Sequence, residues 1–482
     1  MAERTGLKPK SILPSTMPHG ILVFFCLILM VYGLFTPNPL ETAWFACMLI
    51  ILMRMWMWKQ HPAILLYLFA LQFIESHASL FEANNFGITL NELFPDSGKQ
   101  TWWMASFGLL SMMIGTQVLI QRARRFKIPS FEHLQRQAEG ISQTRLLACI
   151  LVSHGAASLV DSVIPYGSSL AQIETYVSGI PNALTLAFGI HFFLTRKRPT
   201  LVFALFLYLL VTSFYSYFSS WREPLIFVLV CYFVSLKKFE FRDLARLAPI
   251  IIPSLALVLI WQTVKGEYRA FISGGLQDQS IRVTQSEALG KFFELGTTAL
   301  NENQTLDDPV ISATYRRAGY LEYFSAAVTK VPAEIPHQKG TLLSESLSFA
   351  LIPRILNPNK GVKNDRKKVE RFTDYHFGGE RNVSSFSLGH YCEAYIDWGP
   401  NGMMIHLFIY GIIGGVLLVI TTNRTRRLNP ILSFGILWVV LTPWGTFQQD
   451  MTTISGKVFW GSVCHLLIFF PLYRWTNRLI QS

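Results

Sequence analysis

The sequence predicts an all-α polytopic membrane protein, and three features of its 482 residues support that class. Only 15% of the residues are charged, against roughly 25% in soluble proteins. The mean hydropathy is +0.34, and apolar segments recur from residue 18 almost to the end of the chain. The aromatic fraction of 14% suits a lipid-facing surface with interfacial Trp and Tyr. This composition excludes a water-soluble enzyme, a disordered chain and a small disulfide framework.

Hydropathy predicts the membrane spans. A helix needs ~20 mostly apolar residues to cross ~30 Å of hydrocarbon, and about twelve segments meet this requirement. We expect them near residues 18–36, 40–58, 62–80, 101–120, 146–162, 171–194, 200–219, 223–236, 247–265, 402–420, 428–446 and 456–474. The chain then has three regions: residues 1–265 with spans one to nine, residues 266–401 as one large loop, and residues 402–482 with spans ten to twelve. A loop of ~130 residues is far longer than ordinary connections and indicates a functional segment.

Basic residues predict the orientation, because short cytoplasmic loops are enriched in Lys and Arg. Clusters such as Arg122–Lys127, Arg196–Arg198 and Lys237–Arg246 follow even-numbered spans. We therefore expect both termini in the cytoplasm and the large loop outside, in the periplasm. That loop carries 15 basic and 16 acidic residues, so the net charge of +12 lies elsewhere in the chain. The charge indicates membrane topology rather than a nucleic-acid partner.

The alternate loops lack such basic clusters. Residues 75–99, between spans three and four, are expected outside and carry Glu75, Glu82, Glu92 and Asp96. Five of the six cysteines lie in or beside predicted spans, and only Cys392 lies outside. We therefore expect no disulfide between external cysteines and no cysteine pair with metal-ligand spacing.

Arginines at the roots of the large loop are candidate ligands for an anionic lipid headgroup. Arginine holds phosphate through two parallel hydrogen bonds and never deprotonates, and a diphosphate leaving group needs such neutralisation as its bond breaks. The favoured residues are Arg222, Arg269 and Arg354. The alternative for each is an arginine that reaches to the membrane interface. The basic run of residues 360–371 better fits a solvated helix face or a patch docked on acidic headgroups.

His390 and Glu393 are candidate general bases just before span ten. They stand three residues apart, so they share one face if that stretch is helical. Either group could take a proton from a sugar hydroxyl. Alternatively, His390 is an interfacial hydrogen-bonding residue and Glu393 is the salt-bridge partner of one of those arginines. His376 and Asp450, both expected outside, are weaker candidates.

Several catalytic motifs are absent from the sequence. The chain has no Asp/Glu-x-Asp/Glu pair, no P-loop, no G-x-S-x-G and no H-E-x-x-H, which removes the usual nucleotide and metal sites. A nucleotide-driven pump is therefore not expected. Any transferase should work without a metal ion or other cofactor.

Two segments resemble the Wzy-type polymerases that join oligosaccharide repeat units. They are Leu351–Lys360, with the order Pro-Arg, Pro and Lys, and Gly389–Gly402, with the order Gly, Glu-x-Tyr and Gly-x-x-Gly. Arg222, after Trp221, is similar to an arginine at the start of a helix in that family. Many spans, one large late outer loop and a few helices after it are also similar over nearly the whole chain.

The resemblance implies a GT-C-like fold and an exopolysaccharide or O-antigen polymerase of the bacterial inner membrane. A glycan on undecaprenyl diphosphate would be transferred to a hydroxyl of an incoming lipid-linked repeat unit. Arg222, Arg269 and Arg354 would hold the diphosphate, and Glu393 or His390 would activate the acceptor. The implied partners are membrane lipid, the lipid-linked oligosaccharide, and a flippase and chain-length regulator of the same pathway.

Two other functions stay open from the sequence. An O-antigen ligase uses the same donor with a lipid A core or protein acceptor. A secondary transporter also has about twelve spans with both termini inside. Against the transporter, the long loop follows span nine instead of dividing two equal halves, and the central spans lack the paired acids of a proton relay.

Overall fold

The computed structural model describes residues 19–57, 63–123, 129–164, 171–215, 222–237, 241–275, 281–302, 308–352, 357, 360, 365–376 and 387–481. Every regular element in these ranges is a helix, and the only β-type pairing there is one isolated bridge between Ile141 and Gln481. The all-α class predicted from composition is therefore confirmed for the described part of the chain.

The helices fall into three groups along the chain. Before the predicted large loop they are α1 (His19–Gly33), α2 (Pro39–Met57), α3 (Ala63–Asn85), α4 (Leu90–Leu93), α5 (Gly98–Arg122), α6 (Phe131–Glu139), α7 (Gln143–Val163), α8 (Ala171–Val177), α9 (Gly179–Thr195), α10 (Pro199–Phe214), α11 (Arg222–Val234) and α12 (Phe241–Ile272). The loop contains α13 (Gln285–Asn301), α14 (Asp308–Ala318), α15 (Glu322–Lys330), α16 (Thr341–Leu351) and α17 (Asp365–Phe372). The last group is α18 (His390–Thr425), α19 (Pro430–Leu441), α20 (Met451–Val463), the π-helix η2 (Cys464–Ile468) and α21 (Phe470–Ile480).

The helices overlap the described parts of the predicted spans, but fewer than twelve of them have the length and apolar composition of a membrane span. Six helical segments in the described residues are long and apolar enough to cross a membrane, and a seventh is added if the bent pair Met451–Ile468 and Phe470–Ile480 forms one span. The six are Ala63–Asn85, Gly98–Arg122, Gln143–Val163, Glu174–Thr195, Ala245–Ile272 and His390–Thr425. The expected outer loop of residues 75–99 is wrong at its start, because α3 continues to Asn85 and carries Glu75 and Glu82 within the helix.

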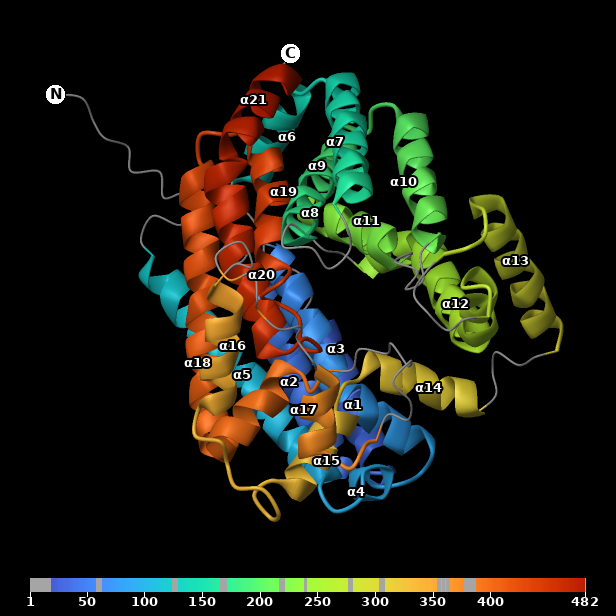
Figure 1. Ribbon diagram of the computed structural model, residues 1–482, viewed down its shortest axis with the longest axis vertical. Helices are drawn as coiled ribbons and strands as arrows, with labels where there is room; N and C mark the ends of the chain where they lie inside the picture. The colour runs from blue at the N-terminus through green and yellow to red at the C-terminus, as the bar shows by residue number, and fades with distance from the viewer. Residues whose placement is uncertain are drawn as a thin grey trace.

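The central contact of the bundle is between α5 and α18, which lie along each other in Figure 1. A Cβ atom on Gly115 would lie 2.1 Å from the carbonyl oxygen of Phe408, and one on Gly411 would lie 2.1 Å from that of Met112. The Thr116 hydroxyl donates to the Gly411 carbonyl at 2.9 Å. The two backbones therefore touch directly, as small residues allow between membrane helices.

The two ends of the bundle collect different segments (Figure 1). At the end with the C-terminus, α6 lies beside α21, and Arg145 donates to the Gln481 carbonyl at 3.1 Å. Lys237, after α11, pairs with Glu132 of α6 at 2.8 Å. The helices α4 and α15 lie at the opposite end. The loop with α6 and the loop after α11, both expected on the cytoplasmic side, thus meet at one end of the bundle.

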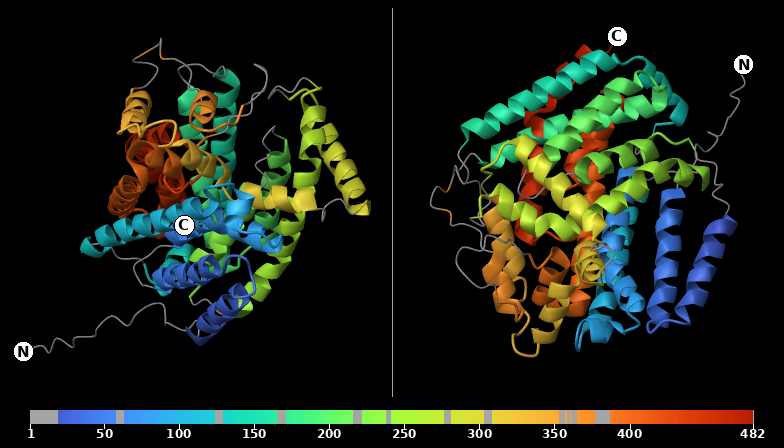
Figure 2. Two further views of the ribbon diagram at one scale, coloured as in Figure 1. Left: turned by 90° about the horizontal axis from the view of Figure 1, so that it is seen from below. Right: turned by 90° about the vertical axis from the view of Figure 1, so that its right-hand side faces the viewer.

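Two parts of the fold position the candidate site. The helix α18 breaks at Gly399, whose φ of 68° is readily adopted only by glycine, and the following Pro400 has no N–H to donate. This separates a short segment with His390 and Glu393 from the long apolar remainder. On the other side of the molecule, α10, α12 and α13 share a hydrophobic cluster of their own that includes Phe214, Trp261 and Phe292. Figure 2 shows α12 and α13 at the outside of the bundle.

Adding a methyl group at the α5–α18 contact should destabilise the protein. We expect Gly411→Ala to lower the free energy of unfolding by about 1–3 kcal/mol, because the new Cβ overlaps backbone that cannot turn aside. The matched control is Gly155→Ala in α7, where a Cβ meets nothing within 4 Å and alanine should stabilise the helix by up to about 1 kcal/mol. Thermal unfolding in detergent measures both. Equal midpoints for the two variants would contradict the direct backbone contact.

Candidate functional site

One face of α3 is polar although the helix is otherwise apolar. Five polar residues on this face lie three or four positions apart along the helix and are all buried, while the buried His77 lies on another side; the five are Gln72, Glu75, Ser76, Ser79 and Glu82. This spacing places them along one side of a helix. Ionisable groups inside membrane helices are expensive to bury and are usually tied to function. The polar face of α3 is therefore the natural start of a site.

The segment between α19 and α20 packs on this polar face. Gln72 donates its side-chain amide to the Gly445 carbonyl at 3.2 Å and accepts from the Tyr391 hydroxyl at 2.8 Å. The Glu75 carboxylate faces the backbone N–H of Phe447 and the side chain of Gln448. Residues 445–448 are thus held against the middle of α3.

The helix α14 packs on the same face further along. Glu82 accepts from the Ser312 hydroxyl at 2.6 Å and from Arg316 Nε at 3.3 Å. The backbone N–H of Tyr320 donates to the Glu75 carbonyl at 3.1 Å. These contacts fix the last turn of α14, and with it Arg317, beside the Glu75 side chain.

Four cations from three helices interact in sequence, beginning with the two that act on Glu75, and we call them the arginine cluster: Arg222, Lys265, Arg269 and Arg317. Arg222 and Arg317 interact electrostatically with each other and with Glu75. Lys265, on α12, interacts with both Arg269 and Arg317. Arg222 and Arg317 are exposed, so an incoming ligand can reach them.

The cluster unites two of the three arginines predicted to bind a diphosphate. Arg222 and Arg269 both belong to it and are linked through Lys265 and Arg317, whereas Arg354 lies outside the described residues. Lys265, Arg317 and Glu75 do not stand out in the sequence as site residues. For Glu75 a signal exists, the three-to-four-residue spacing of polar side chains through a predicted span. For Arg317 the sequence offers only a pair of neighbouring arginines.

Glu393 lies in a separate buried ion pair. Its Oε1 accepts from Lys368 Nζ at 2.8 Å, and its Oε2 accepts from the Met451 backbone N–H at 2.7 Å. Asp450, which caps α20, lies 3.7 Å from the same ammonium group. Burial acts to lower the pKa of Lys368, but the carboxylates of Glu393 and Asp450 outweigh it and raise that pKa above its ordinary value. Glu393 is thus an ion-pair partner, as the alternative expects, but its cation is Lys368 and not one of the candidate arginines.

His390 is buried among aromatic side chains. Its ring centroid lies 4.7 Å from that of Tyr391 and 5.0 Å from that of Tyr410. The ring nitrogens face the carbonyls of Thr446 and Phe447 without reaching hydrogen-bond geometry. Neither His390 nor Glu393 is among the groups on which Arg222 or Arg317 act. The catalytic roles of both residues stay predictions.

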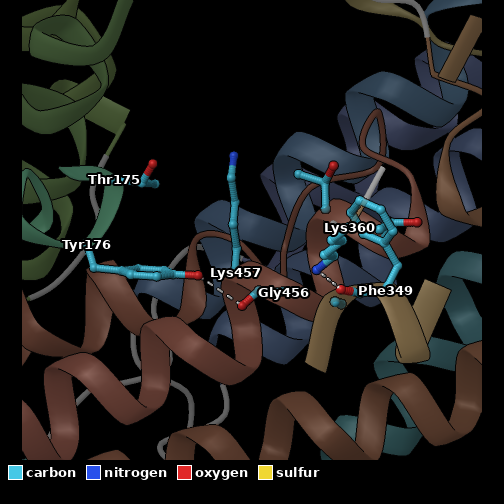
Figure 3. A pocket seen from close by; sticks show the side chains of 9 residues that line it. Thr175, Tyr176, Phe349, Lys360, Gly456 and Lys457 are labelled. Atoms are coloured by element: carbon cyan, nitrogen blue, oxygen red, sulfur yellow. Dashed lines mark hydrogen bonds between the residues drawn. The ribbon is translucent and has the colours of Figure 1, made fainter. Parts of the chain in front are cut away.

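A small polar cavity lies between α8, α16 and α20 (Figure 3). Its volume is about 190 Å³, and it is lined by Thr175, Tyr176, Phe349, Ala350, Lys360, Thr452, Thr453, Gly456 and Lys457. Tyr176 donates to the Gly456 carbonyl at 3.2 Å, and Lys360 Nζ lies 4.1 Å from the centre of the Phe349 ring. Lys457 interacts with Glu223, which neighbours Arg222. Glu223 therefore interacts both with Lys457, which lines the cavity, and with Arg222 of the arginine cluster.

Fold and site together define a helical protein with membrane-length apolar helices and a basic, solvent-reachable cluster held on a buried polar face. Within the ranges that the structure describes, no group of three or more His, Cys, Asp or Glu side chains is arranged to hold a metal ion.

The chain belongs to the family described as Domain of unknown function (DUF8712), which matches residues 104–475. The matched region contains the arginine cluster and the Lys368–Glu393 pair, while α3 precedes it. No curated protein and no solved structure matches the chain.

Removing the Lys368 charge should destabilise the protein, because it leaves Glu393 buried without its cation. We expect Lys368→Met to cost about 3–5 kcal/mol in the free energy of unfolding. The raised pKa of Lys368 means that this stabilisation is complete at neutral pH and disappears only as the pH rises through that pKa, in the strongly alkaline range.

Thermal unfolding of the purified protein at neutral pH tests this loss. The control is Arg366→Gln on the same helix, where an i,i+4 pair with Glu370 is expected to contribute only about 0.3–0.5 kcal/mol. A Lys368→Met variant no less stable than the control would show that the buried pair contributes nothing.

Proposed function

We propose that the protein is a metal-independent membrane glycosyltransferase that polymerises lipid-linked repeat units. A glycan is transferred from undecaprenyl diphosphate to a hydroxyl of an incoming lipid-linked unit, and undecaprenyl diphosphate leaves. The observation that supports this best is the arginine cluster beside Glu75. The resemblance to Wzy-type polymerases in the sequence supplies the substrate class.

The arginine cluster suits a diphosphate for electrostatic reasons. Like charges brought together repel one another, most strongly where the surroundings are apolar, so a multiply charged anion binds favourably among them. Guanidinium groups hold phosphate oxygens in pairs. Because negative charge grows on the leaving diphosphate as its bond to the sugar breaks, the same groups stabilise the transition state.

The activated lipid provides the driving force in this proposal, so neither a nucleotide nor a metal ion is required. Glu393 or His390 would activate the acceptor as the sequence predicts, although an acceptor hydroxyl would have to displace Lys368 or Met451 to reach the Glu393 carboxylate.

In its membrane setting, the proposed enzyme has twelve spans in a GT-C-like arrangement within the bacterial inner membrane. Both termini are cytoplasmic, and residues 266–401 lie in the periplasm. The helices α6 and α21 lie at one end of the bundle, and α4 and α15 lie at the other. This arrangement supports the alternation of cytoplasmic and periplasmic loops from which the orientation is predicted. A flippase would deliver the repeat units, and a chain-length regulator would act on the product.

An O-antigen ligase is the second candidate, favoured by the same cluster. The cluster would bind the donor, which ligase and polymerase share, and the two enzymes differ in the acceptor. A lipid A core or protein acceptor therefore has to be supplied to detect ligation.

Product formation by the purified protein tests the function. The full chain in nanodiscs is incubated with undecaprenyl-diphosphate-linked repeat units from its own organism, with a chelator and without nucleotide. We expect a ladder of lengthening lipid-linked glycan on a gel. Arg222→Ala and Arg317→Ala should each lower the rate by about 10²–10³-fold, as for other groups that stabilise developing charge.

The control variant is Arg427→Ala, an exposed residue after α18, which should leave the rate unchanged. Product formed only with a lipid A core or protein acceptor would replace the polymerase with the ligase. Movement of the lipid-linked unit across the bilayer without product would establish the transporter. Full activity of both cluster variants would remove the arginine cluster from the site.

A further inference from the structure

Glu75 has the features of a reactive group. Its side chain is 6% exposed, in the middle of an apolar helix. The Phe447 N–H and the Gln448 side chain face the carboxylate, while Oε2 has no hydrogen-bond partner among the residues that the structure describes. A buried polar atom without a partner costs free energy and calls for an explanation.

The charges around Glu75 come from several elements. Arg222 of α11 and Arg317 of α14 act on it electrostatically, yet Glu75 forms no direct ion pair with any Lys or Arg of the described ranges. The hydroxyl groups of Tyr67 on α3 and Tyr391 on α18 also interact with the carboxylate. Glu75 is thus held within the field of two arginines without being neutralised by contact with either.

The other acids near the site are differently placed. Glu82, about two helical turns further along α3, is in direct contact with Arg316 and Ser312. Glu393 has both carboxylate oxygens occupied and is 0% exposed. Of these three carboxylates, Glu75 alone lies among the arginines that would hold a diphosphate.

We infer that Glu75, in place of Glu393 or His390, is the general base of the transfer, an inference that rests on the proposed function and deepens it. The acceptor hydroxyl oxygen attacks the anomeric carbon, and the bond from that carbon to the diphosphate oxygen breaks. Its electron pair leaves with the diphosphate, which Arg222 and Arg317 neutralise. The hydroxyl proton passes to Oε2 of Glu75. The base and the ligands of the leaving group then belong to one site, where the reacting groups are held close to one another.

Kinetics of Glu75 variants test this role in the full chain in nanodiscs. Glu75→Gln should lower kcat by about 10²–10⁴-fold, the usual contribution of a general base. The KM for the lipid-linked donor and the binding of undecaprenyl diphosphate, measured separately, should change less than about threefold, because these depend on the arginines. Glu75→Asp should retain part of the activity. Formate should restore activity to Glu75→Ala by acting as a substitute carboxylate.

The pH profile gives a readout that a purely structural role would not move. A base must be ionised, so wild-type activity should fall on the acid side, and this limb should be absent from the residual activity of Glu75→Gln. Glu334→Gln is the control, since it removes an exposed carboxylate that lies 4.0 Å from Lys330 and outside the arginine cluster, and it should keep both the acid limb and the wild-type kcat.

Three results would overturn the inference. Full activity of Glu75→Gln would exclude a base role. Weaker binding of undecaprenyl diphosphate with unchanged kcat would show that Glu75 only positions the arginines. If the wild type binds undecaprenyl diphosphate but forms no product with any acceptor, the proposed function itself fails and the inference fails with it. A Glu75→Gln variant that does not fold leaves Glu75→Asp and formate rescue as the deciding measurements.

Discussion

The rest of the structure depends on one constraint, the burial of a polar face on α3 inside an apolar bundle. Carboxylates and amides removed from water must find partners within the protein. Gln72 therefore holds the segment before α20, and Glu82 holds α14. These attachments bring Arg317 to Glu75, while α11 brings Arg222. The site is a product of how this one helix satisfies its polar groups.

The buried charges form two separate systems with different consequences. The Lys368–Glu393 pair, with Asp450 beside it, is closed, because its donors and acceptors meet at contact distance and join α17, α18 and α20. The arginine cluster is open, because like charges face one another in it and two of its cations are exposed. A closed system stabilises the fold, and an open one is suited to a ligand. The segment that resembles a polymerase motif in sequence thus contributes Glu393 to the closed system.

The sequence predicts the helices well and the site only in part. Apolar runs identify the six or seven helices of membrane-spanning length in the described residues, because helix formation in a membrane is a local requirement. Arg222 and Arg269 are found because they stand at the ends of such runs. Lys265, Arg317 and Glu75 are not found, because their proximity depends on how α3, α12 and α14 pack. Counting residues 75–99 as an outer loop also assigned Glu75 to that loop, although the predicted span three runs to residue 80, and this concealed the regular spacing of the polar face. The partners of Glu393 could not be predicted because Lys368 and Met451 approach it from distant parts of the chain.

The separate hydrophobic cluster of α10, α12 and α13 has a mechanical consequence. Arg269 and Lys265 belong to a helix packed mainly within that cluster, whereas Arg222 belongs to a helix packed into the main core. The spacing of the cations is therefore set where two hydrophobic clusters meet, with α14 packed on both α3 and α12. The apolar segment of α12, Ala245–Ile272, is longer than the ~20 residues that cross the hydrocarbon, and helices of such length accommodate to a bilayer by tilting, kinking or thickening it. A tilt of α12 relative to α11 would change the distance between the cations that the two helices carry.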